Sequence, residues 1–530
     1  MSKEKNTRRS FIVNFKKFLS ENLVVILPLV MYSFLLFPFL YTSPCWDGST
    51  ELSTNTGTFR GGFLQSIYDY IKNLTNGGLH PPFKFIVSSI YYTIGGENIL
   101  SYHLMGLTLG YLAILGIYFL CKKLFDKGVG IIASLLFATF PLFVANSLDN
   151  YTDFFVTVFL VLALFAYSQK RLIFYAILAS FTTLSKDTGF ILPLSILLLE
   201  LYSFFLEKQK FFLKALRLSI VIIPIIMYFI WYSYVKFNGF EIFHKYILSE
   251  TASKGAFVTI FYNLLTFNFF HQYAQAHILQ LFYLNFTWVY WLIIIIGFTQ
   301  TIKNFKHQKI KLSFEKNKQK VFLLLFLLSF LLAYTLATVT LQALIAPNPY
   351  VTYFNFNGVY WVMTLIIFIF FAAFLAKTQT ISYQLRLAIS QRNQKIKTIV
   401  AMIIFFVFYT ISVLTFPVLS TPRYALPLIP IIVIAASFVI ASNIKKIPVF
   451  FLLLLSTLNF VGLYFSVDPV SIALWGKNNV AQQSFYNISK TDIDDAVVYN
   501  LQYLLVMKKR SQTNYYPHGG TCNFTDSRQY

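Results

Sequence analysis

Long apolar runs alternate with short polar segments along most of this 530-residue chain. Many runs reach about eighteen residues, enough for a helix to cross a hydrocarbon core about 30 Å thick. In lipid only helices and closed barrels pair every backbone group, and these runs are far longer than barrel strands. The pattern predicts an all-α polytopic membrane protein with about thirteen transmembrane helices, at residues 22–42, 99–121, 130–147, 152–168, 171–186, 188–206, 214–234, 280–300, 321–341, 357–376, 398–416, 424–442 and 447–466.

Composition agrees with this pattern. Hydrophobic residues make up 57% of the chain and charged residues only 12%, whereas soluble domains carry about 25% charged residues. The first span is long enough to remain as an anchor, so no cleavable signal peptide is expected.

The net charge of +23 first suggests a nucleic-acid partner, but the distribution of the charge excludes one. With the N-terminus in the cytoplasm, the inner segments hold 29 of the 43 Lys and Arg but only 6 of the 20 Asp and Glu. The outer side holds 14 of each sign. This is the asymmetry that the positive-inside rule requires, so the spans predict an inner N-terminus and an outer C-terminus.

The polar segments divide the chain further. The run Lys84–Gly95 is too short to cross, and crossing would invert every later loop, so we expect a juxtamembrane or re-entrant helix on the outer face, introduced by a Pro pair. The expected parts are a basic cytoplasmic N-terminus (1–21), a transmembrane domain (22–466) with outer loops at 43–98 and 235–279, and an outer tail (467–530).

The first outer loop carries the densest candidate chemistry. Asp47 and Glu51 are four residues apart, so they would share one face of a helix, and Trp46, Arg60 and His80 accompany them. A carboxylate at the membrane surface can act as a general base or hold a metal. The alternative is a solvated loop with ordinary surface acids.

Several cations stand at the expected outer ends of spans: Arg60, Lys84, Lys186 and Arg423. Such cations suit a lipid phosphate, and Arg adds a bidentate fork. The alternative is contact with lipid headgroups by snorkelling side chains. Lys186 is the most suggestive because Asp187 is adjacent and apolar segments flank it.

Other polar residues give weaker signals. Asp149 and Asp153 lie in an expected short outer turn at 146–153, whereas Asp126, Glu207 and Glu315 resemble plain inner loop charges. A disulfide between Cys45 and Cys522 could form outside the cytoplasm, but two unrelated thiols are the better interpretation. The sequence shows no HExxH, CxxC, GxGxxG or P-loop pattern, which disfavours a zinc hydrolase or nucleotide enzyme.

A membrane transporter or lipid flippase is the rival interpretation. Transporters carry ionisable residues within their spans or broken helices in related halves. Here the predicted spans are almost free of charge, and the polar chemistry gathers on one face. This asymmetry favours an enzyme that acts at the outer interface. A third alternative is a protein of similar fold that has no activity and serves in assembly.

The order of the motifs resembles that of the membrane glycosyltransferases of the C-type fold. Within that group the chain is similar to the bacterial dolichyl-phosphate-mannose-protein mannosyltransferase-like and aminoarabinose transferase-like families. The matching features are Trp46-Asp47…Glu51, His80-Pro81-Pro82-Phe83, Gly95-Gly96, Asp153, Leu184-Ser185-Lys186 with Gly189 and Pro193, and Arg423-Tyr424…Leu426-Pro427…Pro430.

The resemblance implies an inverting sugar transfer from a polyprenyl-phosphate donor on the extracytoplasmic side of the cell membrane. It implies that Asp47 is the acceptor-side base or an acid that orients the substrate. It also implies that Asp153 lines the same cavity, that Lys186 and Arg423 face the phosphate, and that His80 lies near the donor. The sequence departs from the family where Gly48 follows Asp47, because relatives often have an adjacent Asp-Glu pair. The sugar, the acceptor (protein, lipid or glycan) and any dependence on a divalent cation stay open.

Overall fold

The computed structural model describes residues 22–41, 81–96, 98–207, 210–237, 281, 287, 289–297, 393–415, 422–443 and 455–459. Within these ranges the regular structure is helical, as the sequence predicts, and contains no strand. The elements are η1 (Leu23–Val25), α2 (Ile26–Leu36), η2 (Phe37–Phe39), α5 (Phe83–Gly95), α6 (Ile99–Leu124), α7 (Lys127–Ala138), α8 (Pro141–Asp149), α9 (Thr152–Ser168), α10 (Leu172–Thr183), η5 (Asp187–Phe190), α11 (Ile191–Leu206), α12 (Phe211–Phe237), α21 (Gln394–Thr415), η8 (Pro422–Leu428) and α22 (Ile429–Asn443).

Five helices of the described part are long and apolar enough to cross a membrane, and six if a bent pair counts as one span. The thirteen spans, the orientation of the chain and the division into 1–21, 22–466 and 467–530 stay predictions. The bent pair is α7 and α8, which meet at 56° where the sequence predicts one straight span at 130–147. Pro141 opens α8 and holds Phe140 in an extended conformation, so the helix cannot continue through this point.

Several boundaries agree with the sequence pattern. Helix α9 covers the predicted span 152–168, and α6 begins at Ile99, where the side chain of Asn98 accepts a hydrogen bond from Ser101 N at 2.9 Å. A short helix after the Pro pair is confirmed as α5, although its juxtamembrane position stays a prediction. Helix α10 ends at Thr183, earlier than the expected 186.

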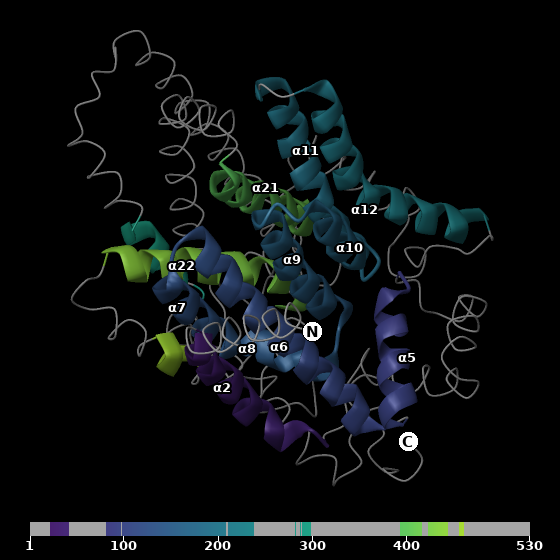
Figure 1. The fold of residues 1–530 in the computed structure, drawn as a ribbon. Coiled ribbons are helices and arrows are strands. Elements are labelled where there is room, and N and C mark those ends of the chain that lie inside the picture. Colours follow the sequence, from purple (N-terminus) through teal and green to yellow (C-terminus); the bar gives the residue numbers. More distant parts are fainter. Residues whose placement is uncertain are drawn as a thin grey trace, which may run out of the picture.

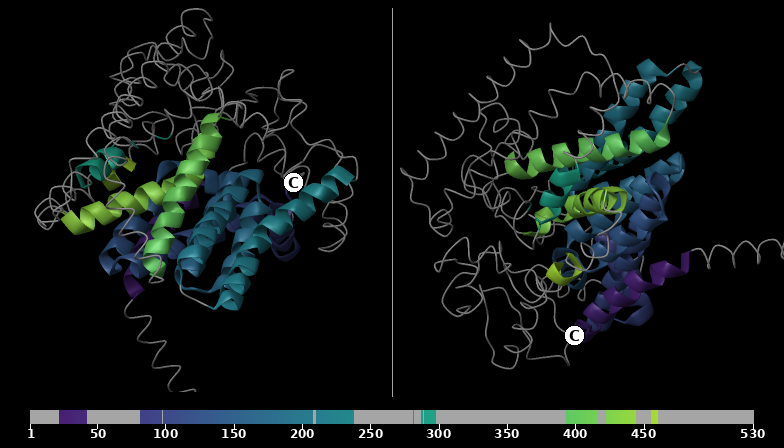
Figure 2. Two further views of the ribbon diagram at one scale, coloured as in Figure 1. Left: turned by 90° about the horizontal axis from the view of Figure 1, so that it is seen from above. Right: turned by 90° about the vertical axis from the view of Figure 1, so that its left-hand side faces the viewer.

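Helix α9 forms the centre of the bundle, and most of its side chains are buried (Figure 1). It packs against α6 and α10, while α7 covers α6 and α12 covers α10. Helix α21 packs on α11, and α22 packs on α7, so segments far apart in the sequence enclose one core. Seen from above, α12 and α22 extend towards opposite sides of the bundle (Figure 2).

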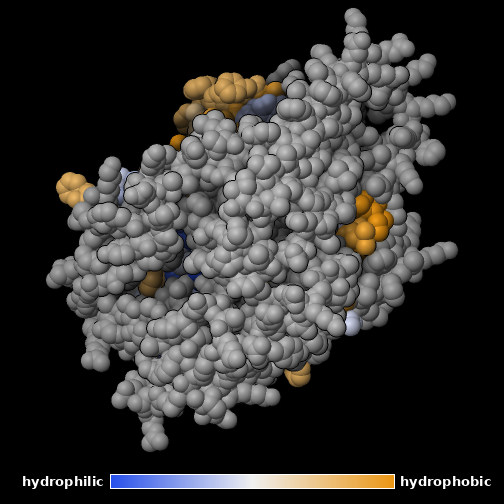
Figure 3. Space-filling view, turned by 180° about the vertical axis from the view of Figure 1, so that it is seen from behind, coloured by the Kyte–Doolittle hydropathy of each residue, from blue (hydrophilic) through white to orange (hydrophobic). Residues whose placement is uncertain are grey.

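The outer faces of several helices are apolar. Ile173 and Phe174 on α10 and Phe229 and Ile230 on α12 are each more than half exposed. Patches of apolar side chains also reach the surface on the face drawn in Figure 3. Apolar faces of this kind suit contact with lipid, because the polar backbone groups are already paired inside each helix.

Candidate functional site

A tight corner between α8 and α9 positions Asp153, which lies in the first turn of α9. Helix α8 extends to Asp149, so the expected polar turn at 146–153 is wrong in extent: only Asn150 and Tyr151 separate the two helices. Asn150 has a positive φ of 48°, and its Nδ2 donates to Tyr102 O on α6 at 2.7 Å. A Cβ on Gly106 would lie 1.8 Å from Ser147 O, so α6 and α8 touch backbone to backbone.

A second tight turn, between α10 and α11, positions Lys186. This residue is the N-cap of η5. A Cβ on Gly189 would lie 2.0 Å from Thr182 O, so only glycine lets η5 fold back onto the end of α10. On the other side of the turn, Phe83 N at the start of α5 donates to Leu184 O at 2.9 Å.

These turns bring together three predicted residues, which we call the Asp153 cluster: Asp153, Lys186 and Arg423. Lys186 Nζ donates to Asp153 Oδ2 at 2.6 Å, and Arg423 Nε lies 4.0 Å from the same oxygen. The Asp153 side chain is 1% exposed, whereas those of Lys186 and Arg423 are 12% and 14% exposed. Asp153 Oδ1 is buried and has no hydrogen-bond partner among the described residues.

Aromatic rings surround the cations of the Asp153 cluster. Lys186 Nζ lies 4.2 Å from the ring centroid of Tyr424, and Arg423 Cζ lies 4.5 Å from that of Tyr151. Both distances suit a cation–π contact. The rings supply no formal charge, so the three residues of the cluster comprise two cations and one carboxylate. Such a cluster can bind an anion such as a phosphate.

The other predicted residues fall into two groups. Lys84 is fully buried at the start of α5, next to Phe83, whose backbone joins the turn that holds Lys186. Asp47, Glu51, Trp46, Arg60 and His80 lie outside the described residues, as do Cys45, Cys522 and Glu315. Cys121 is buried in α6.

No group of three or more His, Cys, Asp or Glu that could hold a metal ion occurs in the described ranges. The carboxylates of the first loop lie outside these ranges.

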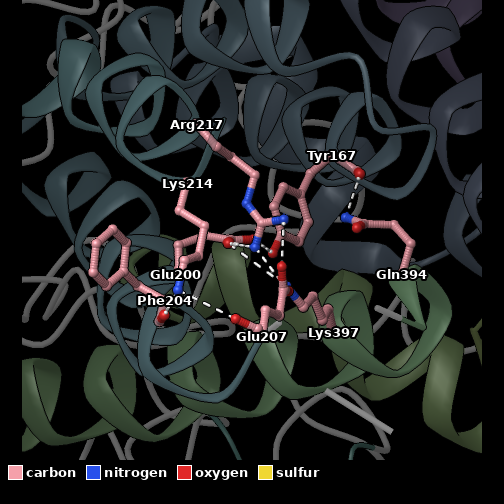
Figure 4. A network of polar contacts seen from close by, with 8 residues as sticks. All are labelled: Tyr167, Glu200, Phe204, Glu207, Lys214, Arg217, Gln394 and Lys397. Carbon is pink, nitrogen blue, oxygen red and sulfur yellow. Dashed lines mark hydrogen bonds and ion pairs between the residues drawn. The ribbon is translucent and has the colours of Figure 1, made fainter. Parts of the chain in front are cut away.

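A second polar cluster, which the sequence interpretation missed, lies at the other end of α9. We call it the Glu207 cluster: Glu200, Glu207, Arg217 and Lys397 (Figure 4). Arg217 pairs with both glutamates, as does Lys397, which comes from α21, 190 residues beyond Glu207. Tyr167 at the end of α9 donates its hydroxyl to Glu200 Oε1. The interpretation of Glu207 as a plain loop charge is therefore wrong.

The surroundings of Glu207 change its acidity. Burial alone would raise the pKa of this carboxyl, but hydrogen bonds from Arg217 and Lys397 and their positive charges outweigh burial. The pKa of Glu207 is consequently below its ordinary value of 4.5. The cluster holds two acids and two bases, so its formal charge is balanced.

The Glu207 cluster also corrects the argument against a transporter. Glu200 is buried within α11, Arg217 lies within α12 and Lys397 lies in α21, so these helices are not free of charge. A sequence signal for this cluster does exist: Glu200 and Glu207 lie within two helical turns of each other, and Arg217 follows in the next predicted helix. Their long-range partner Lys397 carried no sequence signal.

Residues 79–231 match the family described as dolichyl-phosphate-mannose-protein mannosyltransferase. No curated protein matches the chain significantly. Two solved structures with a detectable likeness come from Archaeoglobus fulgidus, and both are oligosaccharyltransferases. One is a complex with Zn and sulfate, with 15% identity and a TM-score of 0.41, covering 83% of this chain and 52% of that chain. The other holds an inhibitory peptide and a dolichol-phosphate, with 14% identity and a TM-score of 0.39, covering 93% and 56%.

The chain thus spans little more than half of the length of those two structures. The family match is more local and more informative, because it runs from the end of the first loop into α12 and includes Lys84, Asp153 and Lys186. The resemblance expected from the sequence is confirmed over this segment: residues 79–231 match the dolichyl-phosphate-mannose-protein mannosyltransferase family of membrane glycosyltransferases.

Proposed function

We propose that this chain is an integral membrane glycosyltransferase. It transfers a sugar from a polyprenyl-phosphate donor to an acceptor on the extracytoplasmic side, with inversion at the anomeric carbon. The observation that carries this proposal is the Asp153 cluster, in which two cations share one buried carboxylate within and beside the family-matched segment. The family name supplies the donor class, a sugar on a dolichyl phosphate.

The proposed reaction is a single displacement. An acceptor hydroxyl or amide attacks the anomeric carbon, the bond from that carbon to the phosphate oxygen breaks, and polyprenyl phosphate leaves with the bonding electrons. A base removes the proton from the acceptor. Attack from the face opposite to the leaving phosphate inverts the configuration of the sugar.

The charge on the departing phosphate grows during this step, because a diester becomes a monoester. Cations that are already in position stabilise that growing charge without reorganising. Lys186 and Arg423 are held by Asp153 at 2.6 Å and 4.0 Å. Asp153 reduces the repulsion between the two cations and leaves an excess positive charge for the phosphate.

The remaining roles rest on the resemblance. Asp47 is assigned as the base on the acceptor side, and Glu51 and Trp46 lie near it in the sequence. Arg60, His80 and Lys84 are assigned to the donor. The buried Oδ1 of Asp153 can accept a hydrogen bond from a hydroxyl of the sugar or the acceptor.

The test is donor turnover by the purified full chain in the presence of a panel of polyprenyl-phosphate sugars and candidate acceptors. Mass spectrometry measures released polyprenyl phosphate. Asp153→Asn keeps the size of the side chain but removes the charge that holds the two cations, and we expect release to fall by roughly 100-fold or more. Asp47→Ala is expected to abolish release.

Lys127→Gln is the matched control, because Lys127 is exposed at the start of α7. It should leave turnover unchanged. Full activity of both Asp153→Asn and Asp47→Ala in folded protein would refute the assigned roles. Movement of a substrate across sealed vesicles without any sugar donor would instead support the transporter.

A further inference from the structure

A cavity of about 290 Å³ lies where α6 and α9 end and α21 begins. Its lining includes Lys123 and Leu124 from α6, Ser168 from α9, and Lys395 from α21. Asp153 and Ser168 are in the first and last turns of α9, so about 22 Å of helix separates the cavity from the Asp153 cluster. The cavity is therefore not part of the candidate catalytic site.

The cavity is basic. Lys123, Lys170 and Lys395 contribute to its lining, together with the amides of Gln169 and Gln394, and the lining includes no carboxylate. All three lysines are exposed, and among the described residues none of their ammonium groups pairs with a carboxylate. Three cations of like charge around one cavity repel one another unless an anion lies between them.

A simpler explanation for these lysines is that each one stabilises the C-terminus of a helix. This explanation fits Lys123 but not Lys395. Lys123 is in the last turn of α6, where a cation is favourable. Lys395 is the second residue of α21, where the helix dipole disfavours a cation and favours an anion. Its position therefore has no explanation in the stability of its own helix.

Lys170 also stands where the backbone disfavours a lysine. It follows α9 with a positive φ of 60°. Arg171 N donates to Ala166 O at 3.0 Å, which closes a C-terminal helix motif that usually has glycine at this position. The left-handed conformation is unfavourable for a residue with a side chain. The lysine places a positive charge at the cavity that glycine would lack.

The Glu207 cluster holds in place the start of α21, which forms one side of the cavity. Gln394 Nε2 donates to Tyr167 O at 2.7 Å, and Tyr167 in turn donates its hydroxyl to Glu200 (Figure 4). Lys397, one turn further along α21, pairs with Glu207. The start of α21 is thus attached to the end of α9 before any ligand binds, so Gln394 and Lys395 are already in position.

From this geometry we propose that the cavity binds the phosphodiester of an anionic membrane lipid. Helices α6 and α21 are both candidate spans, so their ends lie where headgroups lie. The exposed apolar residues Ile173 and Phe174 follow Lys170 closely and suit the acyl chains of the same lipid. A free phosphate shares the headgroup chemistry but has no use for this apolar surface.

The experiment measures lipid binding to the full chain in neutral detergent by native mass spectrometry. The probes are phosphatidylglycerol, phosphatidylcholine and inorganic phosphate. A triple variant, Lys123→Gln with Lys170→Gln and Lys395→Gln, should weaken phosphatidylglycerol binding by roughly 100-fold, because each nearby base contributes about a fivefold factor. The wild type should prefer phosphatidylglycerol to both other probes.

The matched control removes three exposed cations that do not line the cavity: Lys127→Gln, Arg171→Gln and Lys210→Gln. It should change binding by less than about twofold. An equal loss in both triple variants would show general attraction to negative charge and refute the site. Equal binding of inorganic phosphate would assign the cavity to a soluble anion instead.

Lys170→Gly separates binding from folding. Glycine adopts a positive φ without strain, so the thermal midpoint should stay the same or rise. Phosphatidylglycerol binding should nevertheless fall by roughly fivefold because one cation is lost. A variant that folds and binds as tightly as the wild type would contradict the role of Lys170 and, with it, the proposed cavity.

Discussion

The Asp153 cluster and the Glu207 cluster lie at opposite ends of α9, and they use the same kinds of side chain in different proportions. In the Asp153 cluster one carboxylate faces two cations whose side chains are 12% and 14% exposed. In the Glu207 cluster two carboxylates face two cations, and three of the four side chains are 2% exposed or less.

The difference in charge balance distinguishes two uses of buried charge. A cluster with equal numbers of acids and bases can satisfy its own groups, so it can join α11, α12 and α21 with little affinity left for a ligand. A cluster with more cations than carboxylates is less suited to joining helices and better suited to binding an anion. Charge balance, rather than burial alone, therefore distinguishes the two ends of α9.

The largest expected effect separates Lys397 from Lys186. Lys397→Gln removes one of the two cations that pair with Glu207 and Glu200 in the cluster, and breaking a buried pair in this way costs about 3–5 kcal/mol. We expect a clear drop of the thermal midpoint in scanning fluorimetry. Lys186→Gln should also lower the midpoint, because it removes the 2.6 Å hydrogen bond to the buried Asp153 carboxylate, but it alone should reduce donor turnover by roughly 100-fold. Similar midpoints and similar turnover for the two variants would remove the distinction.

The second prediction concerns how the stability of the fold changes at acid pH. The pKa of Glu207 is lower in the folded protein than its ordinary value of 4.5. The stability that it contributes is therefore fully present above pH 4.5 and is lost as the pH falls through the lower, folded pKa. Glu207→Gln should reduce the thermal midpoint at pH 7 and flatten its decline below pH 4.5.

The control for this prediction is Asp126→Asn. Asp126 is exposed and caps α7 by accepting from Val129 N at 2.9 Å, without a described ion pair. This variant should retain the acid-dependent decline seen in the wild type. If Glu207→Gln declines as steeply as Asp126→Asn, Glu207 does not contribute to the acid response.

The smallest expected effect concerns the ring beside Lys186. Tyr424→Leu removes a cation–π contact at 4.2 Å, which is worth about 0.5–1 kcal/mol at a partly exposed position. We expect a two- to fivefold rise in the KM for the donor (about 1 kcal/mol or less). Tyr424→Phe keeps the ring face and should behave as the wild type in the same assay. Equal KM values for Leu and Phe would exclude the ring from donor binding.

Hydrophobic pattern predicted much of the fold, because a span needs only a local apolar run and local caps. The limits of α9 and the start of α6 follow directly from such runs. The bend at Pro141 was present in the sequence as a proline within an apolar run, yet the length of the run outweighed it in the prediction. Helix α10 ended early because Leu184 to Lys186 form the turn that the site requires.

The two clusters differ in how far sequence could reveal them. Asp153, Lys186 and Arg423 were predicted to share a site because of the order of motifs in a family, not because of any local pattern. Lys397 could not be assigned to Glu207, since 190 residues separate them and one basic residue in a basic segment carries no pairing information. Long-range pairing of charges is set by the packing of helices, which a pattern of local periodicity does not specify.

The backbone contact between α6 and α8 makes the position of Asp153 depend on Gly106, a residue that has no side chain. Gly106 lets Ser147 O approach, and the adjoining corner at Asn150 leads directly to Asp153. Any side chain at 106 would push this corner outward and carry the carboxylate away from its cations. In a survey of tolerated substitutions, position 106 would therefore rank beside the charged residues of the site. A position can therefore resist substitution because two backbones touch there, and not because its residue takes part in a reaction.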